Sequence, residues 1–145
     1  MTFDDVAEFA LALAEVTEGA RHGHRTWFVG GRAFAWERPF TKADLKGFGH
    51  ASPPEGSILA VMVASLEAKD LSLTANPTAF FTIPHFHGYP AVLIQLPSVG
   101  RRVLRDALAD AWRAAAPPAL RNRHAADPWL SSSRQMLPTA MAEPE

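Results

Sequence analysis

The chain has 145 residues, of which 48% are hydrophobic and 20% are charged, and its formal net charge is −1. These are ordinary values for one globular domain with a single core. The chain has no cysteine, which excludes disulfides, a thiolate nucleophile and a thiolate zinc site. No stretch approaches the ~18 apolar residues of a membrane span. The acidic start lacks the basic and apolar regions of a secretory signal, so we expect a cytoplasmic protein with no membrane partner.

The first expected element is a helix over residues 3–17. Thr2 and Asp5 have the spacing of a capping box, and Gly19 is a typical helix stop. The apolar residues between them recur at helical spacing: Val6, Phe9, Leu13 and Val16.

A hairpin is expected next. Residues 25–29 and 32–37 are rich in strand-forming side chains, and Gly30-Gly31 joins them. Residues 41–45 form a capped helical turn, and 47–56 have the Gly and Pro content of a loop. A connection of this length is often functional or mobile.

The second half predicts two buried strands. The continuous apolar runs at 58–63 and 91–96 are of strand length. Between them, residues 66–75 form a short helix capped by Ser65. Residues 80–84 are expected to form a helical turn leading into an extended piece, with a short extra strand near Phe81 as the alternative.

A last helix is expected over residues 99–116, with Ser98 as its N-cap and Pro117-Pro118 as its end. Residues 121–145 have no usable periodicity and are expected to form a loosely ordered tail. We therefore expect one domain over residues 1–120. Its fold class is α+β, a two-layer sandwich in which the N- and C-terminal helices cover one face of an antiparallel sheet.

Charge is distributed unevenly along this order. Residues 1–20 carry five acids and no Lys or Arg, whereas 21–46 and 101–124 each carry six basic residues and two acids. Such asymmetry permits a basic face, the electrostatic footprint of a nucleic-acid binder. The alternative is two solvated faces that never meet.

Two groups of basic residues are therefore candidate nucleic-acid or anion contacts. The group at the start of the last helix is Arg101, Arg102 and Arg105, where free backbone N–H groups also favour anions. The group on and after the hairpin is Arg25, Arg32, Arg38, Lys42 and Lys46, of which Arg32 lies at the hairpin tip. Trp27 and Trp36 add stacking if they are exposed, and otherwise belong to the core.

Two His-x-His pairs, His22/His24 and His85/His87, have the spacing for metal binding if their loops meet, but ordinary loop histidines are the simpler interpretation. There is no P-loop, nucleophile elbow or dinucleotide fingerprint. We therefore expect no catalytic role, no cofactor and no metal, although a pocket using His85 and Glu37 stays open as an alternative.

Four segments, in order, resemble the MmcQ/YjbR family. They are Glu15-Val16-Thr17-Glu18-Gly19, residues 27–35 around Gly30-Gly31, the run from Asn76-Pro77 through Phe80-Phe81 to Pro84-His85, and Ala111-Trp112-Arg113 followed by Ala116-Pro117 and Leu120. The resemblance covers about residues 3–120. It implies helices on an antiparallel sheet in a double-wing arrangement, and DNA binding. The chain departs from the family pattern in the long segment 39–57 and in the arginines at the start of the last helix.

The expected function is thus binding of double-stranded DNA, with phosphate contacts from the basic hairpin and the Arg-rich helix start. The alternative is a small-ligand- or protein-binding module with no DNA role. A contiguous positive surface would favour the first, and scattered arginines with an apolar pocket near the 39–57 loop would favour the second.

Overall fold

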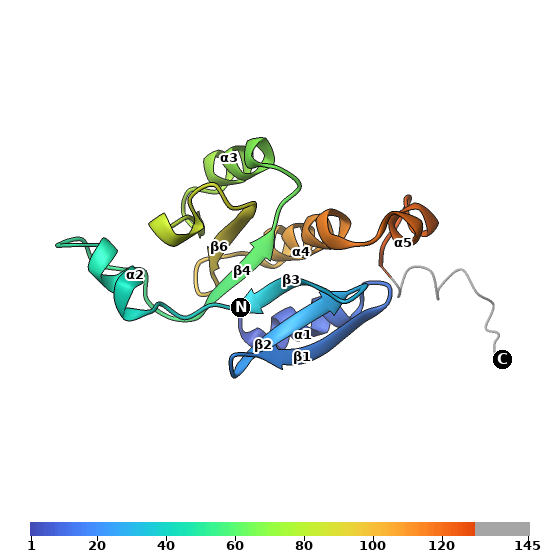
Figure 1. Cartoon of the computed structure of the whole chain (residues 1–145), viewed down its shortest axis with the longest axis horizontal. Helices are drawn as coiled ribbons and strands as arrows, with labels where there is room; N and C mark the ends of the chain where they lie inside the picture. Colours follow the sequence, from blue (N-terminus) through green and yellow to red (C-terminus); the bar gives the residue numbers. More distant parts are fainter. Residues whose placement is uncertain (130–145) are drawn as a thin grey trace.

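The computed structural model describes residues 1–129 and contains one six-stranded antiparallel sheet with helices packed on it (Figure 1). The strands are β1 (Val16–Arg21), β2 (His24–Val29), β3 (Arg32–Glu37), β4 (Ile58–Met62), β5 (Phe80–Phe81) and β6 (Ala91–Gln95). The helices are α1 (Phe3–Leu11), α2 (Lys42–Gly47), α3 (Leu66–Ala75), α4 (Arg101–Ala115), α5 (Pro118–Arg123) and the 3-10 turn η1 (Pro84–Phe86). The strand order is β1-β2-β3-β4-β6-β5, which confirms the predicted α+β class.

Helices α1 and α4 cover one face of the sheet, as predicted. Helix α4 packs on β3 and β4, and α1 packs on α4 and β1; α1 lies behind β1 and β2 in Figure 1. The buried stripe of α4, including Leu104, Leu108 and Trp112, is fully shielded from solvent. Burial of such a stripe supplies most of the stability of a surface helix.

The first helix is shorter than predicted. It ends at Leu11, and Glu15 takes a left-handed backbone conformation (φ 58°) before the chain enters β1. Leu13 has helical spacing from Phe9 but forms a β-bridge to Trp129. Strand β1 was not predicted, because it is an edge strand with almost only exposed residues and no apolar alternation.

The chain also stays ordered beyond the predicted end of the last helix. Helix α4 begins at Arg101 after Gly100, with no side-chain cap, and not after Ser98. Pro118 is the first residue of α5, a position that proline favours, so the Pro-Pro pair separates two helices. We expected the domain to end near residue 120, but Trp129 is only 8% exposed. Residues 130–145 of the predicted tail lie outside the described residues.

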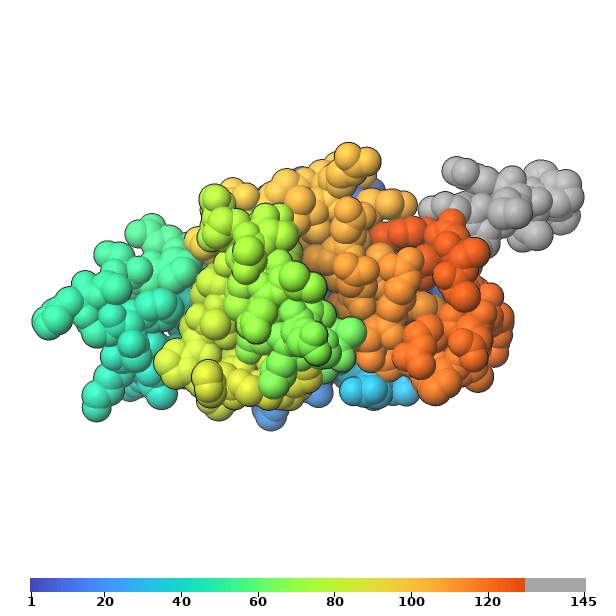
Figure 2. All heavy atoms as spheres, turned by 90° about the horizontal axis from the view of Figure 1, so that it is seen from above, coloured from blue at the N-terminus to red at the C-terminus, as the bar shows by residue number. Residues whose placement is uncertain are grey.

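Helix α2 and its flanking loop form a lobe at one end of the molecule (Figures 1 and 2). The predicted cap is present, since Thr41 and Asp44 form a capping box. Phe40 packs edge-on against Phe48 (5.3 Å between ring centroids) and lies 6.0 Å from the Phe81 ring, which joins the lobe to β5. Helix α3 starts after Ser65, as predicted, and packs on β5 and β6.

Among residues 1–129, no helix is both long enough and apolar enough to pass through a membrane.

Candidate functional site

The arginines at the start of α4 lie against aromatic rings. The Arg101 guanidinium carbon lies 4.7 Å from the centre of the Phe9 ring, and that of Arg105 lies 4.1 Å from the Trp129 ring. Such cation–π contacts explain how these arginines are accommodated at the positive end of the helix dipole. Only Arg102 of this group points to solvent without such a contact among the described residues.

Two cations of the hairpin group are neutralised by carboxylates. Arg25 donates to Glu18 (2.8 Å) and to Asp4 (3.0 Å), and these hydrogen bonds raise its pKa above the ordinary value. Arg38 donates to Asp44 (2.9 Å) in a pair that is largely buried. Neither residue offers a free charge to a phosphate.

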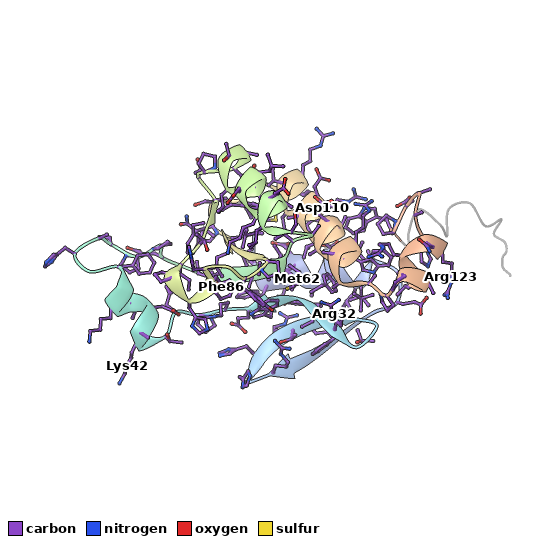
Figure 3. All side chains as sticks on the ribbon, turned by 45° about the horizontal axis from the view of Figure 1, so that its top comes forward. Arg32, Lys42, Met62, Phe86, Asp110 and Arg123 are labelled. Carbon is purple, nitrogen blue, oxygen red and sulfur yellow. The ribbon has the colours of Figure 1, made fainter. Side chains whose placement is uncertain are left out.

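The remaining predicted cations, Arg32, Lys42 and Lys46, are exposed and have no described carboxylate within salt-bridge distance. Figure 3 shows Lys42 at α2 and Arg32 well away from it on the sheet.

Arg25 lies on the face of the sheet that α1 covers, because it reaches Asp4 of α1 and its guanidinium lies over the Trp27 ring. Strand residues alternate, so Thr26 and its register partner Trp36 face the other side. Arg25 therefore points away from the side of β3 that carries Trp36.

A cavity lies on this second face and is the candidate site. It has a volume of about 370 Å³ and opens to solvent. Its lining comes from the β1–β2 hairpin tip, the end of β3 and the η1 loop: Arg21, His22, His24, Thr26, Trp36, Glu37, Arg38, His85, Phe86 and Tyr89. We call this the hairpin cavity.

The hairpin tip is shaped by two consecutive left-handed residues, His22 (φ 55°) and Gly23 (φ 79°). This type of turn matches the twist of the paired strands and places β1 and β2 in direct register. The turn therefore brings Arg21 and His24, which are register partners, to one end of the cavity.

Aromatic rings form the opposite wall. The Phe86 ring lies 6.5 Å from the Trp36 ring and 5.8 Å from the Tyr89 ring, between centroids. Phe86 is buried, whereas Tyr89 is 44% exposed. In Figure 3, Phe86 lies between α2 and the body of the sheet.

A buried lysine from α3 holds the η1 loop. Lys69 is 5% exposed, and its ammonium group donates to the carbonyl oxygens of Phe86 (2.6 Å) and Tyr89 (2.9 Å). Burial lowers the pKa of Lys69, and the charge of nearby Asp70 opposes that effect. The lysine thus fixes the backbone that carries the aromatic wall.

The floor near β3 is fixed by the Arg38–Asp44 pair. Burial of the Asp44 carboxyl raises its pKa, but hydrogen bonds from Thr41 and Arg38 outweigh burial and hold the pKa below its usual value. Arg38 also lies over the Phe86 ring, 5.4 Å from its centre. One buried pair thereby connects α2, β3 and η1.

Among residues 1–129, Glu37 is the one carboxylate lining the hairpin cavity. Its Oε1 accepts a hydrogen bond from the Arg25 backbone N–H (3.3 Å) and lies 3.8 Å from His24 Nδ1. Within residues 1–129, no group of three or more His, Asp or Glu side chains is placed to hold a metal ion. Three of the four imidazoles of the His-x-His pairs nevertheless line the same cavity, His22, His24 and His85.

Comparison with known proteins gives relatives without assigned roles. Over 121 residues the chain is 39% identical to uncharacterized proteins of Mycobacterium tuberculosis and Mycobacterium bovis, covering 82% of this chain and 92% of each relative. This chain belongs to the family of these mycobacterial proteins. No family model matches it.

A Deinococcus radiodurans protein of known structure has the same fold as this chain. The TM-score is 0.59 at 17% identity, over 84% of this chain and 86% of the other, and the Deinococcus protein contains the DUF419 domain of YjbR/MmcQ-like proteins. At that identity the likeness concerns the fold alone.

Most of the cavity was missed from the sequence. The His-x-His spacing and the pair His85 and Glu37 were noted, but Phe86, Tyr89 and Lys69 carried no signal that tied them to the hairpin. The one usable signal was that two segments rich in His and Arg or aromatic residues, 21–25 and 85–89, each contain a turn.

Proposed function

We propose that this protein is a binding module, not a catalyst, and that its ligand is a small molecule held in the hairpin cavity. The observation that carries the proposal is the convergence of three separate chain segments on the hairpin cavity, which has a volume of about 370 Å³. Small-molecule sites usually occupy ~300–1,000 Å³ and combine apolar walls with a few polar groups. The pairing of Arg25 and Arg38 with carboxylates also supports this reading over a phosphate-binding face that uses them.

Rigid support favours the same site. The aromatic wall is held by the Lys69 hydrogen bonds, and the floor by the buried Arg38–Asp44 pair. Binding groups that are fixed before the ligand arrives lose less conformational entropy on binding.

Amide NMR of the ¹⁵N-labelled protein with a set of small aromatic, anionic and cationic compounds tests the proposal. We expect at least one compound to shift resonances of residues 21–26, 36–38 and 85–89 together. Tyr89→Ala removes part of the wall and should weaken that binding about tenfold or more. Leu71→Ala is the control, because Leu71 is 71% exposed on α3 and lies outside the cavity. If no compound shifts these segments, the proposal is wrong.

A second candidate function is binding of duplex DNA by a member of the MmcQ/YjbR family. Four sequence segments and the fold of the Deinococcus protein support the family assignment. Exposed cations without described carboxylate partners favour the DNA contact: Arg32, Lys42, Lys46 and Arg102.

Fluorescence anisotropy with labelled duplex DNA at two salt concentrations tests this candidate. We expect salt-sensitive binding that weakens in Lys42→Glu with Lys46→Glu, and in Arg102→Glu, with a shallower salt dependence. Arg101 and Arg105 are unsuitable probes, since their contacts with Phe9 and Trp129 would be lost with the charge. No binding at low salt would remove duplex DNA from consideration.

A further inference from the structure

The hairpin cavity contains one tryptophan unlike those of the core. Trp27 and Trp112 are fully buried, and their indole N–H groups donate to Glu18 Oε1 (3.0 Å) and Ala14 O (2.9 Å). Trp36 is only partly buried and lines the cavity, and its indole N–H donates to no acceptor among the described residues. Since buried tryptophans usually satisfy this donor, Trp36 offers both a ring and a free N–H to a ligand.

An exposed cation lies over that ring. The Arg21 guanidinium carbon is 5.9 Å from the centre of the Trp36 ring. If a flat ligand ring lies between the guanidinium and the Trp36 ring, these two groups must be about 7–8 Å apart, which is twice the usual contact distance of carbon atoms. Arg21 is exposed at the end of an edge strand, and no described carboxylate pairs with it. It can therefore move outward by about 1–2 Å and close over an inserted ring.

The charges of Glu37 and Arg21 favour a ligand that has both an edge of hydrogen-bond donors and an anionic group. The Glu37 side chain is 31% exposed, and its Oε2 accepts no hydrogen bond from a described residue. It is free to accept from an amino group or ring N–H. The charge of Arg38 is taken by Asp44, so Arg21 is the cation left to meet an anion.

We propose that the hairpin cavity binds a nucleotide unit. The base stacks on Trp36, its amino edge donates to Glu37, and its phosphate lies at the hairpin tip beside Arg21. Aromatic stacking with an adjacent arginine is the usual way that proteins hold an unpaired base, and carboxylates accept from base amino groups. The inference rests on the proposed ligand-binding function of this cavity. The unit is supplied either by a free nucleotide or by an unpaired base of a single strand.

The test is NMR and calorimetric titration of the full chain with AMP, GMP, CMP and UMP, and with a short single-stranded oligonucleotide, beside the non-nucleotide compounds used above. We expect nucleotides to shift the Trp36 indole resonance. Trp36→Ala should weaken binding roughly ten- to hundredfold, and Trp36→Phe, which keeps a ring, should weaken it less. Arg21→Ala should weaken binding about tenfold. Arg113→Ala is the matched control, because Arg113 is exposed on α4 outside the cavity, and should leave the affinity unchanged.

Base preference tests the role of Glu37. Bases with an amino group should bind more tightly than uracil, and Glu37→Gln should reduce that difference. Tighter, salt-sensitive binding of the oligonucleotide would identify a single strand as the source, and equal or tighter binding of the mononucleotide would identify the free form.

Three results overturn the inference. If another compound binds the cavity and no nucleotide does, the nucleotide is wrong while the ligand-binding function stands. If nothing binds the cavity, the nucleotide inference and the proposed ligand-binding function are both wrong. If nucleotides bind equally well to Trp36→Ala, their site lies elsewhere on the chain.

Discussion

Two adjacent glycines at the β2–β3 turn share a backbone conformation but not their surroundings. Gly30 (φ 58°) and Gly31 (φ 80°) are both left-handed, where glycine is favoured. A methyl group on Gly30 would lie 2.4 Å from Pro117 Cγ, whereas one on Gly31 would meet nothing within 4 Å. Gly30 is therefore needed for two reasons: the turn requires a left-handed residue, and Pro117 of the α4–α5 link packs directly on it.

Gly30→Ala should cost more stability than Gly31→Ala. We expect a loss of about 1–2 kcal/mol at Gly31 from the backbone alone, and of about 2–5 kcal/mol at Gly30, where the clash adds to it. Urea unfolding measures both. Pro117→Ala combined with Gly30→Ala should recover part of the loss, and equal losses at the two glycines would show that the Pro117 contact is unimportant.

At the scale of single residues, the sequence predicted the β2–β3 turn but not the contact of Gly30 with Pro117. A Gly-Gly pair between strand-forming runs indicates a hairpin on local grounds. The contact with Pro117 joins residues far apart in the chain, so no local pattern identifies it. The same holds for Lys69, whose buried ammonium group has no sequence signal distinguishing it from an exposed lysine.

Among the elements, α2 is the one that depends on a single buried pair. The sequence correctly indicated a capped turn at 41–45. It did not show that the capping carboxylate, Asp44, is buried and also pairs with Arg38 of the β3 end. One side chain therefore caps α2 and attaches it to the sheet.

Asp44→Asn should lower the free energy of unfolding by about 3 kcal/mol at neutral pH, because it leaves the Arg38 charge buried without a partner. The pKa of Asp44 is lower in the folded protein than in the unfolded chain, so its stabilising effect is present above the unfolded pKa, 3.8. That effect is lost as the pH falls through the folded pKa. The wild-type advantage should therefore shrink in acid.

Urea unfolding across this pH range checks the prediction. Glu55→Gln is the control, since Glu55 is an exposed carboxylate in the same lobe with no described partner. A difference between Asp44→Asn and wild type that stays constant into acid would contradict the assigned role.

Elements with strong internal patterns were predicted well, and those shaped by context were not. Strands β4 and β6 are continuous apolar runs and lie where expected. Strand β1 is polar and is ordered by pairing with β2, so its sequence carries no strand period. Helix α5 was missed because Pro118 was interpreted as a helix end, although proline also starts helices.

At the scale of the whole molecule, two segments far apart in sequence close the fold. The Ala14 N–H donates to Pro128 O (2.9 Å), and Trp112 donates to Ala14 O. Trp129 bridges to Leu13 and carries the Arg105 guanidinium on its ring. The hairpin cavity is likewise assembled from distant segments, which is why the sequence indicated its histidines but not its shape.

Trp129→Ala should lower the free energy of unfolding by about 3–5 kcal/mol, because it removes a large buried side chain and the contact with Arg105. Trp129→Phe keeps a ring and should lose less than half as much. Urea unfolding followed by circular dichroism measures both. If Trp129→Ala is as stable as wild type, the segment after α5 is not part of the cooperative fold.

The closure of residues 13–14 by 128–129 also sets an order of events during translation. Domains tend to acquire structure from the N-terminal end as the polypeptide emerges from the ribosome. Here residues 13–14, just after α1, leave the ribosome early. Their partners at residues 128–129 emerge only after α5. We therefore expect Leu13 and Ala14 to lack their Trp129 and Pro128 partners until that segment has left the ribosome, a period in which chaperones have apolar surface to bind.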